Sequence, residues 1–325
     1  MPIVNDSVLL PVEYSREIIK GVEGKSKAIQ LGRRLADMTT KQRKVPVASL
    51  LPLAYWVANM STPAGAAKEI KNKPISEAAW EGVTLDAEEI AVIIPISKNT
   101  LRDCENIIDL VPQLTNEAVG AFQKVIDESI FFGVNAPWSG FNGLVAEATT
   151  AEQTVPWDGQ GGTSFYKAIS DAMEKVEIAG FLPNAILGGP SLNSAFRGTL
   201  TNLGVLAGDQ GEVGALPRHV DLTGGFNQSS AFAIVGDFNY LVYAFREDME
   251  MTLLTEATLV DPSTGTAKYH LAQQDMVALR FTMRLAAALP VPVNYVSGET
   301  SGDHIKRNAK AYPFAVITKS AQGSN

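Results

Sequence analysis

The chain has 325 residues, of which 46% are hydrophobic and 19% are charged, a composition typical of a folded globular protein. Its formal net charge of −8 argues against a protein that binds nucleic acid by neutralising phosphates, and its single cysteine excludes an intramolecular disulfide or a multi-cysteine metal cluster. The sequence contains no signal-peptide pattern and no run of about 18 apolar residues, so we expect synthesis and folding in the cytosol and no membrane partner.

The N-terminal segment differs from the rest of the chain in charge and in pattern. Residues 1–44 are net basic, whereas the remainder is acidic. Within residues 1–30, two prolines and two glycines interrupt apolar runs, which is too broken for a packed helix and too apolar for a free tail. We interpret this segment as an extended arm that docks on another surface, and its charge suggests complementarity between subunits. A solvated terminal segment is the alternative.

Two short segments follow. Residues 27–39 are a candidate for a short helix. Residues 44–58 are apolar and contain Pro46 and Pro52, a pattern that predicts strand segments near a sheet edge or a bend.

Residues 68–96 alternate like a β-strand but carry many charges and offer little core. We interpret residues 58–96 as a thin hairpin that cannot bury itself within one subunit and therefore lies on a neighbour. The alternation changes phase at Glu88 and Glu89, so we expect a bulge or a strand break there. Paired carboxylates could also indicate acid–base catalysis, but adjacent strand residues point to opposite faces, which favours the structural interpretation.

A long amphipathic helix is predicted for residues 107–133, after a short helix at 98–104 that Ser97 caps. Gly133 supplies the C-terminal stop. The predicted apolar side consists of Ile107, Val111, Leu114, Ala118, Phe122 and Val125, flanked by Val119 and Ile126. The predicted polar side consists largely of Gln113, Asn116, Gln123, Lys124, Asp127 and Glu128.

Helices and strands alternate from Thr163 onward. Ser164 is expected to cap a helix that ends near Gly180, and Pro190 is expected to open a second helix. The Gly-rich residues 204–226 are interpreted as loops. Strands are predicted at residues 185–189, 231–238, 240–245, 249–254 and 275–286, with a hairpin around the turn at 261–265.

The sequence contains no convincing catalytic or cofactor site. The histidines, His219, His270 and His304, have no ligand spacing, and Cys104 lies beside two acidic residues that disfavour a reactive thiolate. The turn at residues 188–194 is similar to a phosphate-binding turn but lacks both established glycine patterns. We therefore expect no catalytic residue, cofactor or metal. An oligomeric α/β enzyme with a binding site in the loops of residues 184–240 is the alternative.

Four segments together resemble the major capsid proteins of tailed bacteriophages with the Hong Kong 97-type fold. They are residues 73–103, 129–144, 235–253 and 278–292, and the resemblance extends from about Lys27 to Ser297. The resemblance implies an α+β capsid fold with an N-terminal arm, an extended loop (E-loop), a peripheral domain built on a spine helix, and an axial domain. These parts correspond to residues 1–40 (arm), 58–96 (E-loop), 41–57 with 97–155 and 270–300 (peripheral domain), and 156–269 (axial domain), followed by a C-terminal extension at 301–325.

The function implied by the resemblance is structural. Subunits would form hexamers and pentamers of an icosahedral virion shell around double-stranded DNA, assembled in the bacterial cytoplasm with a portal and possibly separate scaffolding or decoration proteins. The E-loop would lie across the adjacent subunit and the arm would tie neighbours together, so removal of residues 1–30 is expected to leave a foldable subunit that fails to close shells. Candidates for inter-subunit contacts are Arg33, Arg34, Lys68, Lys71, Lys73, Trp80, Glu88 and Glu89. An encapsulin-type nanocompartment that encloses cargo enzymes is the alternative with the same fold.

Some members of this family crosslink an E-loop lysine to an asparagine of a neighbour with the help of a glutamate. At the corresponding positions this chain has Asp275 and Thr282. We therefore predict that assembled particles boiled in SDS release monomers on a gel. A ladder of covalent multimers would contradict this prediction.

Overall fold

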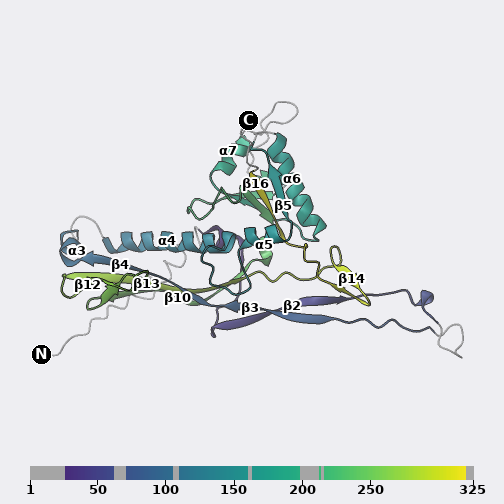
Figure 1. Cartoon of the computed structure of the whole chain (residues 1–325), viewed down its shortest axis with the longest axis horizontal. Helices are drawn as coiled ribbons and strands as arrows, with labels where there is room; N and C mark the ends of the chain where they lie inside the picture. Colours follow the sequence, from purple (N-terminus) through teal and green to yellow (C-terminus); the bar gives the residue numbers. More distant parts are fainter. Residues whose placement is uncertain are drawn as a thin grey trace.

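The computed structural model describes residues 26–61, 71–104, 110–159, 163–197, 212–213 and 216–319. Figure 1 shows an elongated α+β molecule with two layers of structure and one long projection. A unit containing α6, α7, β5 and β16 lies above the long helix α4, α5 lies beside the end of α4, and α4 lies along a flat sheet. The strands β2 and β3 extend away from this body.

The flat sheet beneath α4 has four strands in the order β1-β10-β13-β4. Their bounds are β1 Arg33–Arg34, β10 Val242–Leu254, β13 Met276–Ala288 and β4 Glu88–Ser97. Strand β13 is confirmed as predicted: Val277, Leu279 and Phe281 are buried on the side expected. The two strands predicted at 240–245 and 249–254 are instead one strand, β10, with register shifts after Phe245 and after Glu247.

The long helix is confirmed as α4, Leu110–Phe132, and it ends where Gly133 takes a φ of +70°. Its predicted orientation is partly wrong. Val125 is 42% exposed, whereas Gln123 and Asp127, expected on the polar side, are buried. Ser26, Lys27 and Ala28 donate hydrogen bonds to the buried Asp127 side chain, and Thr223 Oγ1 lies 3.1 Å from its Oδ2. Apolar spacing alone could not reveal such partners.

A close crossing of two glycines joins α4 to the short helix α5, Leu144–Thr150. A Cβ added to Gly133 would lie 2.0 Å from the carbonyl oxygen of Asn142, and one added to Gly143 would lie 2.3 Å from the Gly133 nitrogen. Both glycines also have positive φ angles. Only glycine fits at either position.

The upper unit is built on a six-stranded sheet in the order β5-β16-β9-β6-β8-β7. The strands are β5 Thr154–Trp157, β16 Phe314–Lys319, β9 Ala233–Gly236, β6 Ala185–Gly188, β8 Leu216–Val220 and β7 Glu212–Val213. The helices packed on it are α6 Thr163–Ile178 and α7 Ser191–Arg197. Strand β8 lies in the region interpreted as loops, and Ser164 lies inside α6 rather than capping it.

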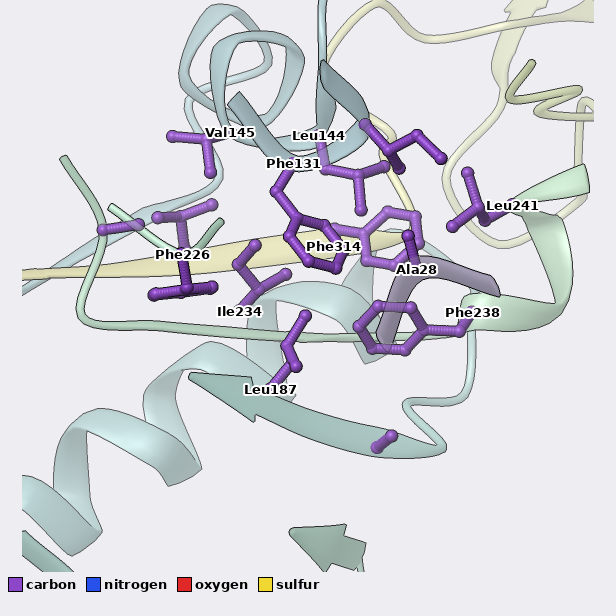
Figure 2. Close-up of a cluster of buried hydrophobic side chains, with 14 of the residues drawn as sticks. Ala28, Phe131, Leu144, Val145, Leu187, Phe226, Ile234, Phe238, Leu241 and Phe314 are labelled. Carbon is purple, nitrogen blue, oxygen red and sulfur yellow. The ribbon is translucent and has the colours of Figure 1, made fainter. Parts of the chain in front are cut away.

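The C-terminal strand β16 is a further correction to the sequence interpretation, which treated residues 301–325 as an extension. Strand β16 lies between β5 and β9, and Phe314, Ala315, Val316 and Ile317 are fully buried. Figure 2 shows Phe314 beside Phe131 and Ile234, so one core runs from the six-stranded sheet to the end of α4.

The pairing of the projection also differs from the prediction. β3, Ala79–Asp86, pairs with β2, Gln42–Pro52, and not with β4. β4 pairs with β13. The strand break expected near Glu88 is therefore confirmed, because Ala87 separates two strands that belong to different sheets. The prediction of a hairpin contained within residues 58–96 is wrong. The change of alternation phase instead marks the point where the chain passes from one sheet to the other.

The remaining short elements complete the fold. The helix predicted at 27–39 is shorter, α2 Lys27–Leu31, because the chain becomes extended at Gly32 and pairs with β10 through Arg33 and Arg34. The short helix α3, Lys98–Cys104, and the hairpin of β11, Thr258–Val260, with β12, Ala267–His270, are confirmed. β14 Glu299–Ser301 and β15 His304–Lys306 extend the sheet of β2 and β3, and single turns of 3-10 helix lie at η1 Val57–Asn59 and η2 Phe238–Tyr240.

The glycine crossing predicts a specific sensitivity. Gly133→Ala is expected to lower the free energy of unfolding by at least about 2 kcal/mol, because alanine disfavours a positive φ and its Cβ overlaps the Asn142 backbone. Urea denaturation of the unassembled subunit measures this loss.

Gly120→Ala is the matched control within the same helix. A Cβ at Gly120 meets nothing within 4 Å, so this substitution is expected to be neutral or to stabilise by up to about 1 kcal/mol. Equal effects of the two substitutions would contradict the crossing as a packing constraint.

Candidate inter-subunit interface

The β2–β3 projection exposes large apolar side chains along its length. Strand pairing extends from Gln42 opposite Asp86 to Leu50 opposite Ala79, and beyond it the two segments continue away from the body. The exposed fractions in this region are 44% for Tyr55, 84% for Trp56, 39% for Val57, 85% for Ile75 and 73% for Trp80. Isolated exposed apolar residues are common, but five along one thin projection indicate a surface that another molecule covers. We call these five residues the hairpin surface.

The backbone around the hairpin surface is held in place although its side chains are not covered. The Leu53 amide donates to Ser76 Oγ at 2.8 Å, and Ser76 in turn donates to the carbonyl of Asp303. The Tyr295 hydroxyl donates to the carbonyl of Pro52 at 3.0 Å. These contacts join both segments of the projection to the residues around β14 and β15. The hairpin surface is therefore preorganised, which lowers the entropic cost of binding.

A groove of about 520 Å³ lies where the projection meets the body. It brings together two of the predicted contact residues, Arg33 and Trp80, which are far apart in sequence. Its other walls come from β2, from η2 and from two prolines of the segment that follows β13, and they include Val45, Pro46, Val47, Ala48, Asp237, Asn239, Tyr240, Pro290 and Pro292.

The charged candidates mainly contact their own chain. Arg34 pairs with Asp37 at 3.1 Å and lies over the Phe245 ring. Glu88 pairs with Lys41 at 3.0 Å. Exposed pairs of this kind contribute roughly 0–1 kcal/mol each. They align the strands locally, and charge alone does not distinguish them as inter-subunit contacts.

Glu89 belongs to a small ion-pair network across the flat sheet. Arg284 contacts Glu89 at 3.4 Å and Glu247 at 3.1 Å. Glu88 and Glu89 are thus separated into different networks on the two sides of the strand, as the alternation of strand side chains requires.

The lysines of the projection are only partly described. Lys71 is half-buried and Lys73 is exposed, and Lys68 lies outside the described residues. At the two positions compared with crosslinking relatives, Asp275 has a φ of +49° just before β13, and Thr282 lies on β13 opposite Ala91 and Glu250.

Sequence reasoning missed the most exposed residues. Trp56 and Ile75 lie in segments interpreted as strand, and an apolar strand residue gives no sign of being uncovered. A second exposed group lies at the end of α6 and in the segment before β14, and consists of Ile178, Leu182, Tyr295 and Val296. For Trp56 the sequence offered one signal. Tyr55 and Trp56 are adjacent aromatic residues between Pro52 and Pro63, which is unusual for a solvent-facing loop.

Among the residues that the structure describes, the three histidines lie on separate strands. His219, His270 and His304 lie on β8, β12 and β15 respectively, and burial lowers the pKa of His219. Within the described ranges no group of three or more His, Cys, Asp or Glu side chains could hold a metal ion. Across the same ranges, no helix is both long enough and apolar enough to cross a membrane.

Comparison with known proteins gives a consistent result. The sequence model of the Phage capsid family matches residues 6–292. The chain is 26% identical over 279 residues to the "Major capsid protein" of Staphylococcus phage 80alpha, covering 84% of this chain and 79% of that protein.

Solved structures agree over nearly the whole chain. A chain from Microbacterium phage Oxtober96 is 31% identical with a TM-score of 0.75, and 91% of each chain is covered. A chain from Mycobacterium phage Cain is 26% identical with a TM-score of 0.76, and 92% of each chain is covered.

The α+β fold with its projecting hairpin is thus that of the tailed-phage capsid proteins of the Hong Kong 97 type. The chain belongs to the phage capsid family. It is a structural protein of the virion capsid that associates with copies of itself, and the enzyme and nanocompartment alternatives are not favoured.

Proposed function

We propose that the hairpin surface of each subunit lies on the adjacent subunit and that this contact joins subunits into the hexamers and pentamers of an icosahedral head. The observation that carries the proposal is the exposure of Trp56 and Ile75 on a projection that the described part of the chain leaves uncovered. Burying apolar surface stabilises by about 25 cal/mol per Å², so repeated burial over many subunits yields a durable shell. No covalent crosslink is needed for this cohesion.

The domain boundaries remain part of the proposal, with two adjustments. We assign residues 1–40 to the arm, 97–155 and 270–300 to the peripheral domain, and 156–269 to the axial domain. Because β2 pairs with β3 while β4 pairs with β13, we change the E-loop from residues 58–96 to β2 with residues 58–86 and assign β4 to the peripheral domain. Because β16 lies within the six-stranded sheet, we add residues 314–319 to the axial domain.

The arm also requires an adjustment. Ser26, Ala28 and Ile29 are buried, and Ser26 and Ala28 donate hydrogen bonds to Asp127. A truncation of residues 1–30 would therefore leave a buried carboxylate without its donors, which is costly to the fold. A truncation that tests the arm therefore has to keep residues 26–30.

The net charge of the subunit supports the proposed contents of the shell. An acidic subunit repeated many times repels DNA, so packaged double-stranded DNA could slide during packing and ejection. A portal, separate scaffolding or decoration proteins, and assembly in the host cytoplasm complete the proposal.

The hairpin contact is tested by Trp56→Ser. Truncation of a buried interface tryptophan costs about 2 kcal/mol or more per contact, so particle yield is expected to fall sharply while the subunit stays folded. Sedimentation separates particles from free subunits, and circular dichroism monitors folding.

Tyr166→Ser is the control, because Tyr166 is also an exposed aromatic residue, at 41%, but lies on α6. It is expected to assemble as the unmodified protein does. Normal particles from Trp56→Ser would refute the proposed contact, as would an equal loss from both variants.

A further inference from the structure

A buried polar cluster joins α2 to α4. Asp127 on α4 is fully buried, and its Oδ1 accepts hydrogen bonds from Ser26 Oγ at 2.7 Å and from the Ala28 amide at 3.0 Å. The Lys27 amide donates to its Oδ2 at 3.3 Å. All three donors lie at the beginning of α2, where the N-terminal segment enters the body. Asp127 therefore holds the start of α2 on α4, and we call this contact the Asp127 clasp.

A second buried carboxylate completes the clasp. Thr223 Oγ1 lies 2.7 Å from Asp221 Oδ1 and 3.1 Å from Asp127 Oδ2, and it accepts a hydrogen bond from the Gly225 amide at 3.2 Å. A hydroxyl carries one hydrogen, so Thr223 cannot donate to both carboxylates. Asp221 is 1% exposed, and its Oδ2 has no hydrogen-bond partner among the described residues.

One additional proton allows Thr223 to hydrogen-bond with both carboxyl groups. If Asp127 Oδ2 carries a proton, it donates to Thr223, and Thr223 donates to Asp221. The hydroxyl then makes one donated and two accepted hydrogen bonds, which is its full capacity. Without that proton, two buried carboxylates face each other across a single hydroxyl, an arrangement that low-dielectric surroundings strongly disfavour.

Charged groups lie near the clasp on each packed element. Asp221 acts electrostatically on Asp127, Lys27 of α2 acts on His219 of β8, and Lys124 and Glu128 flank Asp127 along α4. Lys124 and Glu128 pair with each other at 3.7 Å. Burial raises the pKa of Asp127 to about 6, the amide and Ser26 donors oppose this rise, and Asp221 adds to it.

We propose that Asp127 and Asp221 share one proton through Thr223, and that losing this proton loosens α2 from α4. The proposal concerns this chain alone and does not depend on the assembly contact. An open clasp would give Asp127 an ordinary pKa near 4. The closed form therefore binds the proton more tightly, so closure is strongest at low pH and weakens as the pH rises from about 4 to about 6, with little change above.

Hydrogen–deuterium exchange of the full-length subunit tests the proposal. After correction for intrinsic exchange rates, protection of the amides at residues 29–32 is expected to fall about tenfold between pH 5 and pH 8. Unchanged protection over this range would overturn the proposal.

Asp127→Asn separates the proton from other effects of pH. The amide keeps an oxygen that accepts from Ser26 and Ala28, and its NH₂ group donates to Thr223 as the protonated acid would, but it cannot accept the 3.3 Å hydrogen bond from the Lys27 amide. Protection is expected to be independent of pH. Glu128→Gln, which changes the neighbouring carboxylate, is expected to keep the tenfold fall, and a fall that persists in Asp127→Asn would overturn the proposal.

Asp221→Asn gives an independent readout if Asp127→Asn does not fold. Removing the second carboxylate should shift the midpoint of the transition to lower pH, and an unshifted midpoint would count against a shared proton. Protection that instead depends on added Ca²⁺ or is abolished by EDTA would assign the site to a cation and overturn the proposal.

Discussion

The β2–β3 hairpin cannot cover its own apolar side chains, and the rest of the structure depends on this constraint. A two-stranded ribbon is marginally stable in water by itself. Here it carries Trp56, Ile75 and Trp80 largely in solvent. The single subunit therefore leaves apolar surface in water, and the proposed contact with an adjacent copy would bury it. On that proposal, cohesion of the shell and stabilisation of the projection result from the same burial.

A projection can act on a neighbour only if the body holds it firmly. One residue, Ala87, separates β3 from β4, so the hairpin continues directly into the flat sheet. Leu85 and Ala87 pack in a small core with Val242 and Ala288, which fixes this junction. The glycine crossing at Gly133 and the clasp at Asp127 then join α4 to the remainder of the body. The hairpin direction is thus coupled to the long helix through packed elements.

Local patterns predicted the elements well and their pairing poorly. Period-two alternation identified β13, and apolar spacing with Gly133 identified α4. Pairing is a non-local choice, so the sequence could not reveal that β2, rather than β4, pairs with β3. Strand β16 was missed because its short apolar run lies beyond the region of resemblance. Asp127 was assigned to the polar side, since its hydrogen-bond donors come from residues about 100 positions away. The Arg33–Trp80 groove is equally non-local.

Electron cryomicroscopy of assembled particles tests the central claim most directly. The account predicts that density for Trp56 and Ile75 lies against side chains of an adjacent subunit and that both residues are buried in the shell. Density in which both side chains face solvent, or fold back on their own chain, would contradict it.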